Sequence, residues 1–321
     1  MTAVWFAALA LVLAGPVPAL LARARWTWQV PRAALVLWQS IALAAVLATL
    51  GAGLASLTLL FTEQPGFPFL ARHGLLQTTL NGLTSFLVAV VTIRFWTVAL
   101  LVGVRTRRRR NRHREMVDLL HRRESTGEVD RAVLGESGVR VLTGPGRVAY
   151  CVPGVRGNRV VLSDSVLQQL TPAEVRAVLA HERAHLRARH DLVLEGFTAL
   201  HAAFPRLVSS RSALDTVRLL VEMLADDAAR ARAGSLPLAR ALVQLASAPG
   251  GEGEMALGSD AATRVRRLAQ RPAGECAGGD RALPRRRLAV TVYAASAVVL
   301  VAPTAAIAVP WLRASWDALT G

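Results

Sequence analysis

Residues 171–186 read TPAEVRAVLAHERAHL, and they contain the pattern HExxH between His181 and His185. Thr171 begins a capping box that ends at Glu174, with a proline at the first helical position. The apolar residues that follow recur at helical spacing: Val175, Val178, Leu179 and Leu186. The stretch therefore predicts an amphipathic helix with HExxH in its middle, where the spacing of the two histidines has a geometric meaning.

Two histidines four positions apart on a helix share one face, so His181 and His185 can bind the same metal ion. Glu182 follows the first of them and can act on a water bound to that metal. Zn²⁺ lowers the pKa of such a water and polarises a peptide carbonyl. The pattern predicts a zinc peptidase with one Zn²⁺ per chain; the alternative is a charged surface helix with two solvated histidines.

Three residues compete to be the third zinc ligand. Asp191 stands ten residues after His181, but a ligand there needs the helix to turn back near position 188, where Ala188 disfavours the turn. His190 is out of register with that pattern. We favour Glu222, because it lies in a predicted second helix over about residues 212–233.

Asp226 follows Glu222 by four residues and shares its face of that helix. A carboxylate in this position can accept the free ring N–H of a ligating histidine. The sequence therefore predicts Asp226 as the residue that orients a histidine ligand.

Charge and hydropathy occupy different segments of the chain. The formal net charge is +16, yet the mean hydropathy is +0.37, which is typical of a membrane protein with basic flanks. Crossing the hydrocarbon core takes about 20 apolar residues. The stretches that qualify are residues 3–21, 33–61, 75–104 and 288–310.

Arginines cluster at residues 23–32, 105–114 and 285–287, each beside a predicted span. The positive-inside rule then places the N-terminus outside the cell membrane and residues 105–287 in the cytoplasm. The cluster at 105–114 is best explained by topology and anionic lipid, so we expect no direct nucleic-acid binding. Arg94 marks the inner boundary of the third span or else pairs inside the helix bundle.

We expect the fold class to be a membrane protein with α-helical spans and an α+β, zincin-like (gluzincin) cytoplasmic metallopeptidase domain. Residues 1–104 hold three spans, and residues 105–246 form the catalytic domain. A charged helix is expected near residues 115–123. Strand-like runs at 139–142, 147–152 and 159–163 predict a small antiparallel meander. Its last run supplies Val160, Val161 and Leu162 as an edge strand that pairs with the substrate.

The remaining segments are more weakly marked. Residues 192–207 predict an apolar hairpin or a segment that dips into the membrane surface. Residues 247–287 read as a Gly-, Pro- and Arg-rich linker with a short helix at 262–270. The fourth span, 288–310, precedes a short extracellular tail, 311–321. Cys151 and Cys276 form no metal-type cluster and suit a reducing compartment.

These motifs together resemble the integral-membrane zinc metallopeptidases of the BlaR/MecR type, an antirepressor family of β-lactam-sensing receptors. The resemblance rests on the N-terminal spans, residues 158–185, the Glu-x-x-x-Asp box at Glu222 and the final span. The HtpX-type membrane quality-control peptidases share the HExxH and Glu-x-x-x-Asp patterns and are the second family of interest. The chain shows no Ser-x-x-Lys penicillin-binding sensor after its last span, so we expect no β-lactam sensing by this chain.

The resemblance implies that His181, His185 and Glu222 bind zinc and that Glu182 is the general base and acid. It implies a membrane-embedded endopeptidase in regulated signalling. The substrate would be a cytoplasmic or juxtamembrane protein or peptide, for example a winged-helix transcriptional repressor. The alternatives are an HtpX-like quality-control protease, and a non-catalytic signalling or scaffold protein in which His190 or Asp191 closes a four-ligand zinc site. A metal-free membrane protein with a coincidental motif is the third possibility.

Overall fold

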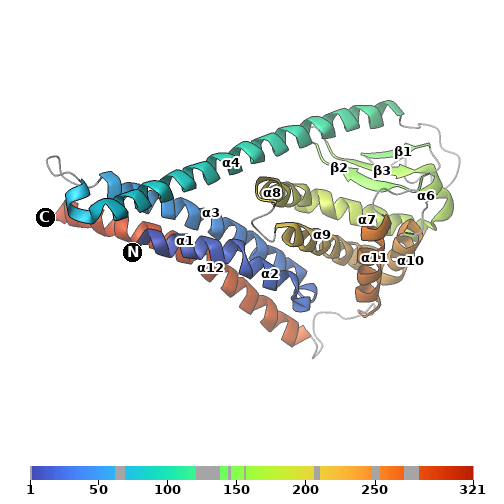
Figure 1. Ribbon diagram of the computed structural model, residues 1–321. Helices are drawn as coiled ribbons and strands as arrows, with labels where there is room; N and C mark the ends of the chain where they lie inside the picture. The colour runs from blue at the N-terminus through green and yellow to red at the C-terminus, as the bar shows by residue number, and fades with distance from the viewer. Residues whose placement is uncertain are drawn as a thin grey trace. The chain divides into compact units, whose positions relative to one another are not determined.

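The computed structural model of the chain describes residues 2–61, 69–120, 138–143, 146–154, 157–205, 210–246, 254–270 and 282–320 (Figure 1). The chain forms two compact units. The first comprises Met1–Leu101, Phe197–Val217 and Pro284–Gly321, and the second comprises Val102–Gly196 and Arg218–Leu283. The limits predicted for the domains remain a prediction, and each unit is described by itself.

Four segments in the described helices are long and apolar enough to cross a membrane. They are Val4–Ala22, Pro31–Ser56, Gly82–Leu120 and Pro284–Ala306. These segments overlap the four predicted spans. The first consists of α1 (Thr2–Ala14) and α2 (Pro16–Ala22), which break at Gly15 because the prolines at positions 16 and 18 cannot continue a helix from the preceding turn.

The other apolar helices are longer than predicted. They are α3 (Pro31–Phe61), α4 (Phe69–Leu120) and α12 (Ala282–Thr320). The predicted loop before the third span is therefore helical from Phe69, and the predicted C-terminal tail is helical as far as Thr320. The charged helix expected near residues 115–123 is the end of α4; residues 121–123 lie outside the described residues.

The span of α4 exposes large apolar side chains, as a helix in contact with lipid would. Phe86, Ile93 and Trp96 are 68%, 66% and 60% exposed. Arg94 lies between the last two, and its Nε donates to the carbonyl oxygen of Ala203 at 2.8 Å. This residue therefore satisfies a carbonyl at the C-terminal end of α8 (His190–Ala203).

The second unit contains a three-stranded sheet of β1 (Val139–Leu142), β2 (Ala149–Val152) and β3 (Arg159–Ser163). The strand order is β1-β3-β2, with β1 parallel and β2 antiparallel to β3. The predicted antiparallel meander is therefore wrong: the sheet is mixed. Val160, Val161 and Leu162 are all buried, and a continuous apolar run buried on both faces suits a central strand.

Helices cover both faces of this sheet. Val117, near the end of α4, packs with Val152 and Val161 on one face. The motif helix α7 (Pro172–Ala188) packs on the other, with Val175, Val178 and Leu179 against β1 and β3. Figure 1 shows the sheet with α4 on one side and α7 on the other. The final part of α4 is thus a structural part of the second unit.

One short helix precedes α7, and the remaining helices of this region follow it. The short α6 (Asp164–Gln169) separates β3 from α7. The segment predicted as a hairpin at 192–207 is instead one helix, α8, up to Ala203. Then come α9 (Ser210–Ala233), α10 (Ser235–Ala246) and α11 (Glu254–Ala269). Ala177 and Ala180 of α7 pack with Ala229, Leu238 and Leu268 from these three helices.

Candidate metal centre

The predicted capping box starts the motif helix. The Thr171 hydroxyl accepts the Glu174 N–H, while the Glu174 carboxylate accepts the Thr171 N–H at 2.8 Å. The helix ends at Ala188, and Arg189 adopts the left-handed conformation with φ 51°. The chain therefore turns here although Ala188 was expected to disfavour a turn, because Arg189 takes the left-handed conformation. The Arg189 N–H donates to the His185 carbonyl, which closes the helix.

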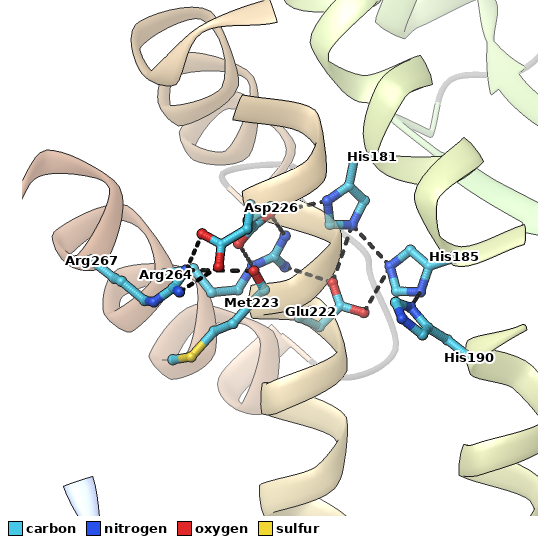
Figure 2. Close-up of polar contacts among 9 residues, drawn as sticks. His181, His185, His190, Glu222, Met223, Asp226, Arg264 and Arg267 are labelled. Atoms are coloured by element: carbon cyan, nitrogen blue, oxygen red, sulfur yellow. Dashed lines mark hydrogen bonds and ion pairs between the residues drawn. The ribbon is translucent and has the colours of Figure 1, made fainter. Parts of the chain in front are cut away.

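This turn does not bring Asp191 to the histidines. Its carboxylate accepts a hydrogen bond from Arg110 of α4 at 2.9 Å. The structure instead brings Glu222 of α9 to the motif (Figure 2). The Nε2 atoms of His181 and His185 lie 3.3 and 3.4 Å from one Glu222 carboxylate oxygen each. Among the described residues, these three form the only group arranged to hold a metal ion.

The spacing of the donor atoms fits zinc. The two Nε2 atoms are 3.1 Å apart. Ligands placed tetrahedrally at 2.0–2.1 Å from a zinc ion are about 3.3–3.4 Å from one another. The separation of the two Nε2 atoms is slightly shorter than this value, and each Nε2 atom lies close to this distance from a different oxygen of Glu222. Two imidazoles with one carboxylate are a donor set that zinc prefers.

Asp226 lies behind His181, as the sequence predicts. Its Oδ1 is 3.0 Å from His181 Nδ1, although the alignment falls short of a regular hydrogen bond and leaves this buried nitrogen without a partner of good geometry. The Asp226 side chain is 1% exposed. A carboxylate so placed holds the ring with Nε2 directed at the ligand cluster.

Arg264 of α11 completes the buried charge network, and sequence reasoning missed it. Its Nε and Nη2 donate to the two Asp226 oxygens at 2.7 Å each, and its Nη1 lies 3.0 Å from Glu222. The short helix predicted at 262–270 is confirmed as part of the longer α11, although the sequence gives it no role at the site. Its signal was the amphipathic pattern of α11, in which Arg264 and Leu268 are buried on one face.

The pKa values of the two carboxylates follow from this network. Burial alone would raise the pKa of Glu222, but the contacts with His181 and Arg264 outweigh it and lower the pKa. For Asp226, burial is likewise outweighed by Arg264 and His181, and its pKa is lowered. Both groups are therefore ionised at neutral pH and can serve as ligand and as acceptor.

His190, the first residue of α8, contacts the far side of the His185 ring. The two Nδ1 atoms are 3.2 Å apart, and the rings are nearly perpendicular at 88°. If His185 offers Nε2 to a metal, its proton lies on Nδ1, so Nδ1 of His190 must accept it. His190 therefore lies outside the ligand cluster and orients His185, which argues against it as a fourth ligand.

This arrangement predicts how His190 substitutions affect zinc binding. His190→Leu removes the acceptor and should weaken zinc binding by about 10- to 100-fold. His190→Asn places an amide oxygen near the position of Nδ1, so its zinc affinity should fall by less than about tenfold. Competition with a chelator of known affinity measures both. Equal losses in the two variants would show that packing, and not the hydrogen bond, is what His190 supplies.

Glu182, next to His181 on the motif helix, is 9% exposed. Burial raises its pKa, with the charge of His181 opposing and that of Glu222 adding to the shift. The Cys151 thiol of β2 interacts with Glu182 and has its own pKa raised, chiefly by burial. A carboxyl with a raised pKa, beside a metal site, is suited to accept and return a proton near neutral pH.

The two motif histidines differ in protonation. Burial alone would lower the pKa of His181, but Asp226 and Glu222 raise it to about 9. Burial lowers the pKa of His185 to about 4. Without metal, His181 is therefore protonated at neutral pH and His185 is neutral.

Zinc binding should consequently release one proton, taken from His181. Protonation competes with the metal below the His181 pKa of about 9, so apparent zinc affinity should rise with pH, by about tenfold per unit around pH 7–8. Calorimetric titration in buffers of different ionisation enthalpy counts the protons. An affinity that is flat over this range would contradict the assignment.

The cluster is open on the Glu222 side. The Glu222 side chain is 33% exposed, against 9% and 13% for His181 and His185. Within the described part of the chain no fourth protein ligand joins these three. A site with three protein ligands and an accessible face is typical of catalytic zinc, whereas structural sites are closed by four.

Strand β2 forms the sheet edge beside the motif helix. The expectation that Val160, Val161 and Leu162 form an edge is wrong, because β3 is paired on both sides. The Ser163 N–H donates to the Val148 carbonyl. The alternation of an antiparallel ladder then directs the backbone groups of Ala149 and Cys151 away from β3, toward the open edge.

Comparison with known proteins agrees with this site. A family model described as Peptidase family M48 matches residues 131–246, which include the sheet, the motif helix and Glu222. Searches of curated proteins and of solved structures give no match. The family match supports a membrane-type metallopeptidase. It does not single out the BlaR/MecR type, and the HtpX-type alternative is equally compatible with it.

Proposed function

We propose that the chain is a membrane-anchored zinc endopeptidase. The main observation behind the proposal is the cluster of His181, His185 and Glu222, whose ligand atoms lie within 4.8 Å of one another and can therefore reach one zinc ion. The match to Peptidase family M48 over the same residues supports it. Zinc bound there would act as a Lewis acid on the scissile carbonyl and would lower the pKa of a bound water.

The residues around the cluster divide the work of the reaction. Glu182 accepts a proton from the attacking water and returns it to the leaving amine, for which its raised pKa is suited. Asp226 orients the His181 ring and His190 orients the His185 ring, each through the Nδ1 atom of the ligand histidine. Arg264 keeps the buried carboxylates ionised and in place.

The substrate binds in this proposal as an extended strand along the open edge of β2. Ala149 and Cys151 present backbone donors and acceptors there, and the Cys151 side chain reaches Glu182. Main-chain pairing at an edge accepts many sequences, which suits an endopeptidase acting on protein segments.

The β2 edge is tested by Ala149→Pro. Proline at an outward-facing edge position removes one donor and leaves the β2–β3 ladder intact. The Michaelis constant should rise about 2- to 10-fold, the value of one main-chain hydrogen bond, with zinc content unchanged. An unchanged Michaelis constant would place the substrate elsewhere.

We infer further that the catalytic unit lies on the cytoplasmic side, because arginines flank the apolar helices at 23–32, 105–114 and 285–287. Its substrate is then a cytoplasmic or juxtamembrane protein. Cleavage of a transcriptional repressor and quality control of membrane proteins are the two roles that the resemblances suggest.

The proposed activity is tested by hydrolysis of unfolded casein with the full-length chain in neutral detergent. The account expects cleavage that stops when 1,10-phenanthroline removes zinc and resumes when zinc is restored. Cleavage that survives complete zinc removal would contradict a zinc mechanism.

A further inference from the structure

A groove of about 550 Å³ lies on the second unit, between the outer face of α7 and the C-terminal end of α9. Four arginines line it: Arg176, Arg183, Arg187 and Arg232. Leu179 and Ala180 contribute apolar surface between them. None of the residues that line the groove is acidic.

The groove is distinct from the candidate metal centre. With 3.6 residues per turn, Arg176, Arg183 and Arg187 share one face of α7, roughly opposite the face that carries His181 and His185. The Arg187 Nε donates to the Arg183 carbonyl, which holds that guanidinium along the helix. Arg232 comes from the last turn of α9. The groove therefore joins the back of the helix that carries HExxH to the helix that carries Glu222.

The chemistry of the groove matches one kind of ligand. A guanidinium group is planar and can donate two parallel hydrogen bonds to two oxygens of one phosphate. Such charge-assisted hydrogen bonds are among the stronger polar contacts. The volume lies within the range of small-ligand sites, about 300–1,000 Å³.

We propose that this groove binds a phosphate-bearing anion, which bridges Arg176, Arg183 and Arg187 of α7 to Arg232 of α9. Two sources share that chemistry: a soluble phosphate ester and the headgroup of an anionic lipid. Binding at this face does not require the metal centre, so the inference stands apart from the proposed peptidase activity.

The test uses the full-length chain in neutral detergent, freed of zinc so that metal chelation cannot imitate binding. Inorganic pyrophosphate represents the soluble anion, and dihexanoyl phosphatidic acid represents the headgroup. Each is titrated calorimetrically at constant ionic strength. The variant Arg176→Gln/Arg232→Gln removes one guanidinium from each helix. The matched control Arg211→Gln/Arg240→Gln removes the same charge from exposed arginines that do not line the groove.

We expect at least one probe to bind the wild type, with affinity at least about tenfold weaker in the groove variant and nearly unchanged in the control. Preference for pyrophosphate would identify a soluble ligand, and preference for the lipid probe would identify a headgroup; both support the site. Failure of both probes to bind, or equal weakening in the two variants, would overturn it.

Discussion

Glu182→Gln should abolish peptide-bond hydrolysis while leaving zinc bound. The substitution keeps the size of the side chain but removes its ability to accept and return a proton. Since Glu182 is not in the ligand cluster, the three donors should still hold the metal. Loss of a positioned general base lowers rates by about 10²- to 10⁴-fold. Casein hydrolysis by wild type and variant, at equal zinc content, measures the effect.

A matched control exists on α8. Glu195 is a carboxylate of the same unit that pairs with Arg110 at 3.6 Å and is not in the ligand cluster. Glu195→Gln should leave hydrolysis nearly unchanged. If Glu182→Gln retained full activity, another group would have to carry the proton, and the assignment would be wrong.

Arg264→Met should destabilise the protein more than any other single substitution considered. It would strip both short hydrogen bonds from Asp226, whose side chain is 1% exposed. It would also remove one of the two cations beside Glu222, leaving protonated His181. Removing one partner from a buried ion pair costs about 3–5 kcal/mol when the remaining charge is left uncompensated, and protonated His181 offsets part of this cost here. Thermal unfolding of the zinc-free chain in detergent should show this as a lowered midpoint.

Arg267 supplies the matched control one turn further along α11. Its two Nη atoms donate hydrogen bonds of 2.8 and 2.7 Å to the two carboxylate oxygens of Asp227, whose side chain is 26% exposed. Arg267→Met should therefore lower the stability of the protein less than Arg264→Met does. The double variant Arg264→Met/Asp226→Leu should recover stability relative to Arg264→Met, since no buried charge is stranded. Similar losses from Arg264→Met and Arg267→Met would contradict the role given to the buried pair.

The local parts of the site could be predicted from the sequence. The Thr171 capping box and the HExxH spacing depend on residues within one or two turns, and the helices α7 and α9 are confirmed. The pairing of Glu222 with Asp226 at helical spacing is equally local. Their approach to the histidines followed from recognising two complementary motifs.

The long-range parts could not be predicted. Strand order depends on which edges meet in space, and a short apolar run such as Val160–Leu162 fits either an edge or a central strand. Arg264 lies 38 residues from its partner Asp226, in a segment whose glycines and prolines suggested a linker. The left-handed turn at Arg189 could not be predicted either, because glycine is the usual residue in that conformation and position 189 carries arginine.

The most direct test of the account is the zinc content of the purified full-length chain, measured for wild type beside His185→Ala and Glu222→Ala. The account predicts about one zinc per wild-type chain and loss of the metal from both variants. Zinc retained in Glu222→Ala would contradict the third ligand, and a wild-type chain that binds no zinc even when it is supplied would contradict the metal centre itself.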